Sequence, residues 1–250
     1  MKMNCQYNTA KLSGYANFNQ FAAALLLAAG LFATGCATAP HAPPPTSKVQ
    51  QTALTPSQAF EKLEAGNARF VAGQPLHRDW AAQRAQTAAG QYPFAIVLSC
   101  VDSRTSSEII FDQGFGDIFN ARVAGNVLDD DILGSMEFAC KVAGAKLIVV
   151  VGHSHCGAVK GACNGAQLGH LTGLLEKIQP SVTEAKAKLP GVAVTDGTFI
   201  ETVAKLNVHS VIKQIREQSP VLHELIDSGA VGIVGGSYDL DTGKVDFFKN

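Results

Sequence analysis

The sequence lacks an excess of basic residues, and this absence excludes one broad class of function. Its 20 lysines and arginines are balanced by 21 aspartates and glutamates, so the formal net charge is -1. Proteins that bind the phosphate backbone of nucleic acids need a basic surface, and we therefore expect no nucleic-acid partner. The chain is instead long and apolar enough for one domain with a buried core, since 46% of its 250 residues are hydrophobic.

Acidic residues are absent from the beginning of the chain, where Glu61 is the first. Two lysines, Lys2 and Lys11, precede an apolar stretch at residues 21–32, FAAALLLAAGLF. This stretch is shorter than the roughly 20 apolar residues that a transmembrane helix needs. A basic start followed by a short apolar stretch is typical of a secretory signal peptide.

Small residues and a cysteine, ATGC at residues 33–36, follow the apolar stretch. They resemble a bacterial lipobox, in which the cysteine becomes the lipidated N-terminus; an ordinary cleavage site is the alternative. We expect a signal peptide at residues 1–35, a lipidated Cys36 as the only attachment to a membrane, and a periplasmic location. The proline-rich stretch that follows predicts an extended linker over residues 36–52, and the domain then covers residues 53–250.

Short apolar runs alternate with helical patterns through the rest of the chain. Runs that are typical of buried strands lie at residues 93–99, 146–157 and 230–239, and residues 117–123 are a further strand candidate. Apolar residues at helical spacing cover residues 55–73, 129–144, 170–188 and 197–217, and the first of these helices begins with a capping box of Thr55 and Gln58. The alternation predicts an α/β fold with a mostly parallel central sheet flanked by helices. Residues 241–248 are expected to add an antiparallel edge strand at the C-terminus.

Metal-binding side chains stand at the ends of two of these runs. Cys100 follows the run at residues 93–99, and His153 and Cys156 close the run at residues 146–157. The carboxyl ends of parallel strands share one edge of a sheet, where ligands bind in such folds. Two thiolates and one imidazole favour Zn²⁺ over harder cations and leave its fourth position open to water. Either motif alone is common in a protein core, but the two together predict a zinc site.

Longer motifs around these ligands resemble a known family. CVDSR at residues 100–104 and GHSHCGAVKG at residues 152–161, together with NARF, ARVAGN and YDLDTG, resemble the β-class carbonic anhydrases. The similarity covers nearly all of residues 55–250. It implies the fold of that family, with Zn²⁺ as the cofactor and Cys100, His153 and Cys156 as its ligands. It also implies reversible hydration of carbon dioxide to bicarbonate by a zinc-bound hydroxide.

The same resemblance assigns further residues. In a closed form of the family the Asp102 carboxylate is the fourth zinc ligand, and in an open form it pairs with Arg104 and accepts a hydrogen bond from the hydroxide. Since the carbon dioxide pocket of the family lies at a dimer interface, the resemblance implies a homodimer or a higher even oligomer. It places a substrate-binding amide at Gln91 and the apolar lining of the pocket at Phe119, Ala124 and Phe138.

Some interpretations stay open at the level of the sequence. Relatives of this fold hydrolyse carbonyl sulfide or carbon disulfide with the same site, and a zinc-binding lipoprotein without turnover is a further alternative. Val97 stands where some bacterial members carry the tryptophan of an inhibitory bicarbonate pocket, so we expect no such pocket. Cys140 and Cys163 are interpreted as core thiols, with a disulfide between them as the alternative. His155 is interpreted as a surface or supporting residue rather than a proton relay.

Overall fold

The computed structural model describes residues 40–248 of the chain. The expected signal peptide and Cys36 therefore lie outside the described residues, and both stay predictions. Within residues 40–248, every helix is too short or too polar to cross a lipid bilayer.

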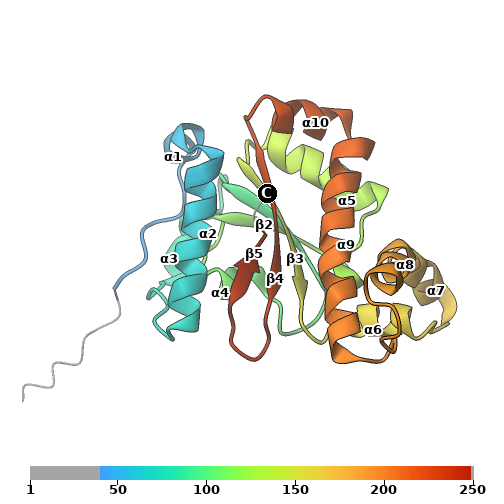
Figure 1. Cartoon of the computed structure of the whole chain (residues 1–250). Coiled ribbons are helices and arrows are strands. Elements are labelled where there is room, and N and C mark those ends of the chain that lie inside the picture. The colour runs from blue at the N-terminus through green and yellow to red at the C-terminus, as the bar shows by residue number, and fades with distance from the viewer. Residues whose placement is uncertain (1–39, 249–250) are drawn as a thin grey trace, which may run out of the picture. The chain divides into compact units, whose positions relative to one another are not determined.

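A five-stranded sheet forms the centre of the domain, in the order β2-β1-β3-β4-β5 (Figure 1). The first four strands are parallel and β5 is antiparallel to β4. The fold class predicted from the alternation of strands and helices is confirmed. The strands are β1 (Ala95–Ser99), β2 (Ile118–Arg122), β3 (Leu147–His153), β4 (Gly232–Tyr238) and β5 (Val245–Phe247).

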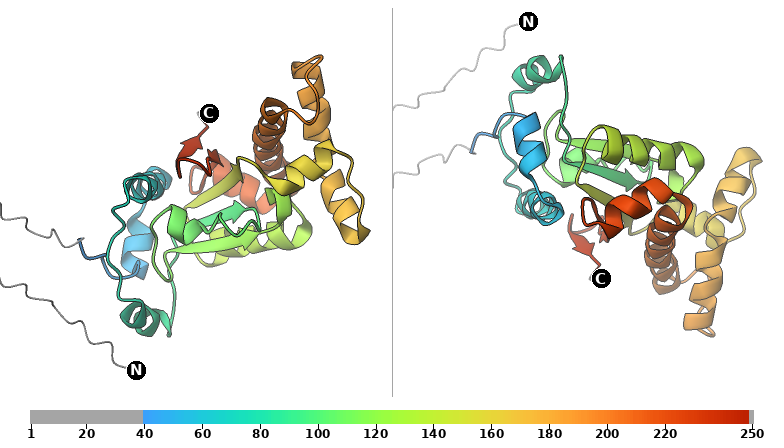
Figure 2. Two further views of the ribbon diagram at one scale, coloured as in Figure 1. Left: turned by 90° about the horizontal axis from the view of Figure 1, so that it is seen from below. Right: turned by 90° about the horizontal axis from the view of Figure 1, so that it is seen from above.

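Helices cover both faces of the sheet, as the views in Figure 2 show. Along β1, Ile96 and Leu98 point into a cluster with α5, α9 and α10, whereas Ala95 and Val97 point into a cluster with α2 and α4. Burial on both faces explains the unbroken apolar runs of β1 and β3. The helices are α1 (Lys48–Ala53), α2 (Pro56–Val71), α3 (Trp80–Thr87), α4 (Ser107–Ile110), η1 (Ala124–Asn126), α5 (Asp130–Glu137), η2 (Phe138–Val142), α6 (Gly157–Cys163), α7 (Gly169–Glu176), α8 (Gln179–Lys188), α9 (Gly197–Gln218) and α10 (Pro220–Asp227).

Local sequence signals explain where several helices begin and end. The capping box of Thr55 and Gln58 is present at the start of α2, as predicted. The single helix predicted over residues 170–188 is wrong, because the structure divides it into α7 and α8. Pro180 has no N–H to donate to the carbonyl of Glu176, and it is instead accommodated in the first turn of α8. The predicted helix at residues 129–144 continues past α5 as a wider π-turn, η2.

The predicted linker ends earlier than residue 52, because part of it packs on the domain. Residues 48–53 form α1, and the side chain of Gln51 is buried there. Gln51 Nε2 donates to the carbonyls of Pro93 at 2.7 Å and Ala143 at 2.9 Å. Upstream, Thr46 donates to Asp117 through both its amide and its hydroxyl. Residues 46–53 are therefore a strap that is held on the domain rather than part of an extended spacer.

Cys140 and Cys163 lie in different parts of the core. Cys140 packs with Met136 and Leu133 in the cluster beneath α5, and Cys163 packs with Leu175 in the cluster of α6 to α9. Both are buried free thiols in this structure. Their placement agrees with the interpretation of two core thiols.

Candidate metal centre

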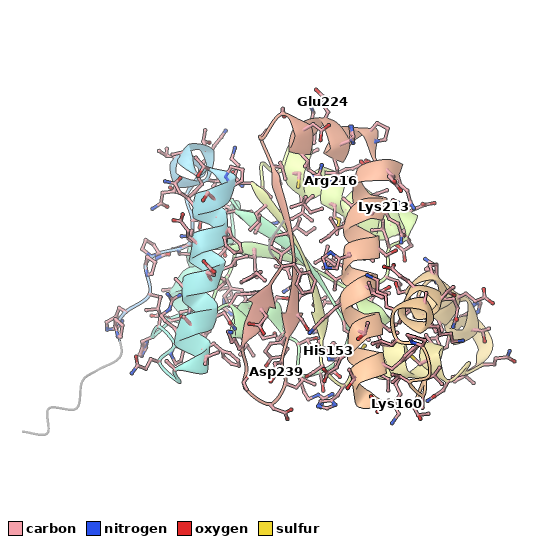
Figure 3. All side chains as sticks on the ribbon, viewed as in Figure 1. His153, Lys160, Lys213, Arg216, Glu224 and Asp239 are labelled. Atoms are coloured by element: carbon pink, nitrogen blue, oxygen red, sulfur yellow. The ribbon has the colours of Figure 1, made fainter. Side chains whose placement is uncertain are left out.

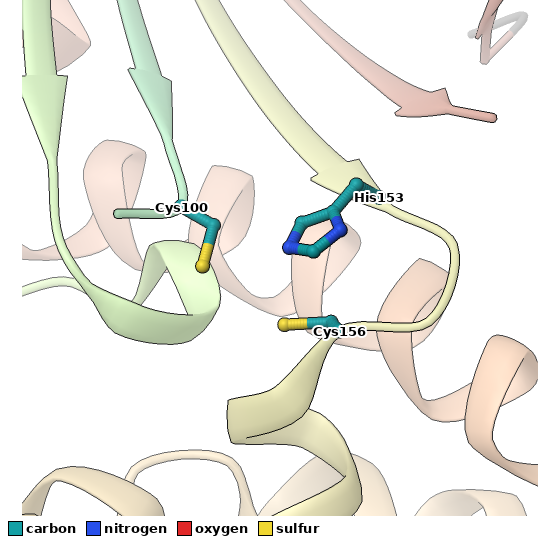
Figure 4. A group of neighbouring side chains, drawn as sticks. All are labelled: Cys100, His153 and Cys156. Carbon is teal, nitrogen blue, oxygen red and sulfur yellow. The ribbon is translucent and has the colours of Figure 1, made fainter. Parts of the chain in front are cut away.

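Three soft donors meet at the carboxyl edge of the sheet. Cys100 directly follows β1, His153 is the last residue of β3, and Cys156 is the N-cap of α6. Because β1 and β3 are parallel neighbours, their carboxyl ends lie side by side. The two sulfurs and a ring nitrogen of His153 all lie within 4.8 Å of one another, and all three residues are buried (Figure 4). The structure brings together the ligand set predicted from the sequence.

The His153 ring is oriented by its own turn. Its Nδ1 lies 2.8 Å from the carbonyl of Ser154, which can only accept, so Nδ1 carries the proton. The tight turn to Cys156 needs a left-handed residue, and His155 supplies it with a φ of 55°. The other ring nitrogen, Nε2, is buried and has no hydrogen-bond partner in the described part of the chain. A buried ring nitrogen whose lone pair receives no hydrogen bond is suited to bind a metal ion.

The two thiols interact closely with each other. A hydrogen bond from Cys156 holds the pKa of the Cys100 thiol well below its usual value, despite burial. The same bond, together with burial, raises the pKa of Cys156. The Gly125 amide also donates to Cys100 Sγ at 3.3 Å. The protein groups alone thus stabilise one thiolate at this site. A second thiolate so close to the first needs a cation to offset its charge, and Zn²⁺ is such a cation because thiolates and imidazoles are its preferred ligands.

Asp102 points to Arg104 instead of joining the three donors. Its carboxylate accepts from Arg104 Nε at 2.9 Å and from Nη2 at 2.8 Å, and also from the Arg104 amide at 3.0 Å. These bonds from Arg104 hold the pKa of Asp102 well below its usual range, so the carboxylate is ionised. The structure thus has the open arrangement of the two that the resemblance implies, with three protein donors at the centre.

The loop that carries Cys100 and Asp102 is fixed from β2. Arg122 Nε donates to the carbonyl of Cys100 at 3.0 Å, and its Nη2 donates to the carbonyl of Asp102 at 2.5 Å. The Thr105 hydroxyl lies 2.9 Å from both of these carbonyls. Sequence reasoning missed Arg122 and Thr105 as supporting residues, because neither spacing nor residue type indicates which carbonyl a side chain will reach.

The residues assigned to the substrate pocket are divided between the two ends of the sheet. Ala124 lies in η1, next to the Gly125 amide that contacts Cys100. Gln91 is exposed and precedes β1, so the length of this strand, about 17 Å, separates it from Cys100. The rings of Phe119 and Phe138 contact each other edge to face, with their centroids 6.2 Å apart, beside the amino half of β2. One chain alone therefore does not assemble the expected pocket.

A small cavity approaches the centre from the side of α9. It measures about 80 Å³, and its lining includes His153, Glu201 and Asp239. Figure 3 shows His153 and Asp239 at the same end of the sheet. His155 is largely exposed nearby, with its ring 3.5 Å from the Asp241 carboxylate. This surface placement agrees with the interpretation of His155 from the sequence.

Comparisons with known proteins agree with the geometry of the centre. The family model described as carbonic anhydrase matches residues 95–245, which include all three donors. Carbonic anhydrase 2 of Mycobacterium tuberculosis is 40% identical over 196 residues, covering 76% of this chain and 91% of that protein. A solved β-carbonic anhydrase of Aspergillus fumigatus is 27% identical, with a TM-score of 0.62 over 68% of this chain and 86% of that one.

A second set of similar solved structures is also described by its oligomeric state. Two tetrameric β-carbonic anhydrases of Sordaria macrospora are represented by a chain that is 25% identical, with a TM-score of 0.61 over 68% of this chain and 91% of that chain. The family model, the relatives and the solved structures all indicate the same family. This chain belongs to the carbonic anhydrase family and to its β class.

Proposed function

We propose that the chain binds one Zn²⁺ through Cys100, His153 and Cys156 and catalyses the reversible hydration of carbon dioxide to bicarbonate. The observation that carries this proposal is the convergence of three buried soft donors within 4.8 Å. The unpartnered Nε2 of His153 and the paired thiols of the two cysteines fit a tetrahedral Zn²⁺ site with one position left for solvent. When bound, Zn²⁺ supplies the positive charge that makes water a good nucleophile near neutral pH.

Asp102 and Arg104 orient the water that reacts. Because the Asp102 carboxylate is ionised, it can only accept hydrogen bonds. In this proposal it accepts one from an O–H of the reacting water molecule. This bond turns a lone pair of the water toward carbon dioxide. Arg104 holds the carboxylate in that position through two N–H bonds and prevents it from becoming a fourth metal ligand.

The name of every relative and solved structure reported above favours carbon dioxide as the substrate. Each is a carbonic anhydrase, whereas none of these names points to hydrolysis of carbonyl sulfide or carbon disulfide. A zinc protein without turnover would close its site with a fourth protein ligand. Here the fourth candidate, Asp102, is engaged by Arg104. The open site supports catalysis.

A second copy of the chain completes the site in this proposal. Gln91, Phe119 and Phe138 lie too far from Cys100 to serve it within one chain, and Phe138 is 53% exposed at the edge of β2. The proposed assembly is a homodimer or a higher even oligomer in which each copy lends these side chains to the other. The tetrameric assembly named for the Sordaria macrospora proteins supports an even oligomer.

The proposed location is the periplasm, with the protein anchored by a lipid on Cys36. The support is the sequence pattern of a short apolar stretch followed by ATGC. A Cys36→Ala variant is expected to move from the membrane fraction to the soluble fraction of the cells. Retention of this variant in the membrane fraction would contradict the lipid anchor.

The decisive experiment measures zinc content and carbon dioxide hydration on the same purified sample. The wild-type protein is expected to hold one zinc per chain and to hydrate carbon dioxide in a stopped-flow pH assay. Cys100→Ser should lose both zinc and activity, whereas Cys140→Ser, at a buried thiol away from the centre, should keep both. Turnover of carbonyl sulfide or carbon disulfide in place of carbon dioxide would overturn the proposed substrate, and a zinc-free active protein would overturn the proposed site.

A further inference from the structure

A buried asparagine on α9 contacts the loop that supports Cys100. Asn207 is 2% exposed, and its Nδ2 donates to the carbonyl of Gly125 at 2.8 Å. The amide of the same Gly125 donates to Cys100 Sγ at 3.3 Å. Asn207 and Cys100 are thus joined through the two polar groups of one residue, although Asn207 lies far from both in the sequence.

Gly125 has little freedom to move within this arrangement. Its φ of 68° lies in the left-handed region, which glycine adopts without strain. A Cβ at this position would come 2.8 Å from Ile178 Cδ1 and 3.2 Å from Ala158 Cβ. Neighbours on one side and Asn207 on the other therefore fix where the Gly125 amide points.

We propose that Asn207 is a positioning residue for the metal centre. By holding the Gly125 carbonyl, it keeps the Gly125 amide directed at the sulfur of Cys100. A hydrogen bond to a ligand sulfur withdraws part of its charge and orients it, and such outer contacts change both metal affinity and the electronic properties of the site. This inference rests on the proposed zinc site.

A second buried asparagine provides a matched control. Asn67 on α2 is 5% exposed, and its Nδ2 donates to the carbonyls of Gly243 at 2.9 Å and Ile110 at 3.2 Å. Its Oδ1 accepts from the amide of Val245 at 2.9 Å. Asn67 thus joins a helix to neighbouring backbone just as Asn207 does, but none of these contacts reaches a metal-binding residue. Loss of Asn67 should affect stability alone.

The test uses the purified protein with Co²⁺ in place of Zn²⁺, because cobalt reports on its sulfur ligands by a charge-transfer absorption band. Asn207→Leu keeps the branched shape and the number of heavy atoms of the side chain and removes the donor. It is expected to shift this band to longer wavelength and to weaken zinc binding in a chelator competition by about tenfold or more. Asn207→Ala, measured alongside, should give the same shift if the leucine variant does not fold. Asn67→Leu should leave band and affinity at the wild-type values.

Two results distinguish this inference from the proposed function. An unchanged band and affinity in both Asn207 variants, in a wild-type protein that binds cobalt through sulfur, would overturn the role of Asn207 alone. A similar shift in Asn67→Leu would also overturn it, since the change would then follow from general loosening of the core. A wild-type protein that shows no sulfur-to-cobalt band would overturn the metal site and this inference together.

Discussion

The Asp102 carboxylate is held by Arg104 through two parallel N–H bonds, at 2.9 Å from Nε and 2.8 Å from Nη2. This geometry needs the planar fork of a guanidinium, because an ammonium group is a single point charge that cannot make the paired contact. The pair stands beside Cys100 at the open side of the centre. Its geometry, and not only its charge, keeps the carboxylate away from the metal-binding donors.

Arg104→Lys is therefore expected to reduce carbon dioxide hydration by about 100-fold, the scale of losing one positioned hydrogen-bonding group in an active site, while zinc remains bound. The measurement is stopped-flow hydration with zinc analysis of the same sample. Arg216→Lys is the control, because Arg216 pairs with Asp227 at 3.3 Å on the surface away from the centre. Full activity of the Arg104 variant would show that the paired contact is not needed.

The buried thiol of Cys140 predicts a change of stability with pH. Burial raises the pKa of Cys140 to about 12, whereas the thiol in the unfolded chain titrates near 8.5. The stabilisation from keeping the thiol neutral is complete below about pH 8.5 and is lost as the pH rises toward 12. In that window the wild-type protein should lose up to about 1.4 kcal/mol per pH unit relative to Cys140→Ala.

Urea denaturation of the two proteins between pH 7.5 and 10.5 checks this prediction. At pH 7.5 the alanine variant is expected to be less stable, because it leaves a cavity in the core. The difference in free energy of unfolding should then narrow with rising pH. If the difference in free energy of unfolding stays constant over the whole range, Cys140 does not titrate in the unfolded chain while it stays neutral in the folded protein, and the prediction is wrong.

The order of strands and helices was predictable because it depends on local composition. β1 and β3 are buried on both faces, so their residues form unbroken apolar runs, and Thr55 with Gln58 marks the start of α2. The starts of two further helices carry similar signals in the sequence. Ser47 and Gln50 form a capping box ahead of α1, and Ser219 caps α10. By contrast, α6 has the sequence GAVKGAC, whose two glycines give no helical preference.

The three donors were predictable because each lies next to a strand end, and neighbouring parallel strands share one edge. Their supports were not. Asn207 interrupts the apolar stripe of Ala204, Val208 and Val211 on α9, which signals a buried polar group but does not name its partner. That partner, Gly125, is 82 residues away, and only the packing of α9 against η1 brings the two together.

Gly125→Ala should destabilise the protein by about 2 kcal/mol or more, since the new Cβ meets Ile178 and the backbone is strained. Gly73→Ala is the matched control: its φ of 64° is similar, but no atom lies within 4 Å of a Cβ there. That variant should lose only about 1 kcal/mol, the conformational part of the cost. Chemical denaturation measures both, and equal losses would contradict the close packing around Gly125.

The strap before α2 should contribute to stability through Gln51. Replacing it with alanine leaves the carbonyls of Pro93 and Ala143 without their donor, which is expected to cost about 1–3 kcal/mol. Val49→Ala in the same helix is the control, because Val49 is 80% exposed and its loss should change stability by less than about 0.5 kcal/mol. Thermal denaturation checks both variants. Equal changes in stability for the two variants would show that Gln51 does not hold this segment on the domain.

The proposal that Gln91 serves the site of a neighbouring copy can be tested with dimers that combine two different variant chains. Gln91→Ala and Cys100→Ser should each be impaired as pure proteins. Co-expressed with different tags and purified as the mixed dimer, they should recover roughly half of the wild-type activity. The reason is that the chain with an intact Cys100 then receives Gln91 from the other chain, while the second site of the dimer lacks both residues.

The reverse combination sharpens the test. A dimer of one wild-type chain and one Gln91→Ala/Cys100→Ser chain holds the same two defects in a single chain. If Gln91 serves the other copy, this dimer is nearly inactive, since the wild-type chain has its metal donors but receives alanine in place of Gln91. If Gln91 serves its own chain, this dimer keeps roughly half of the activity and the first mixed dimer has almost none. The separation of Gln91 from Cys100 by the length of β1 predicts the first outcome.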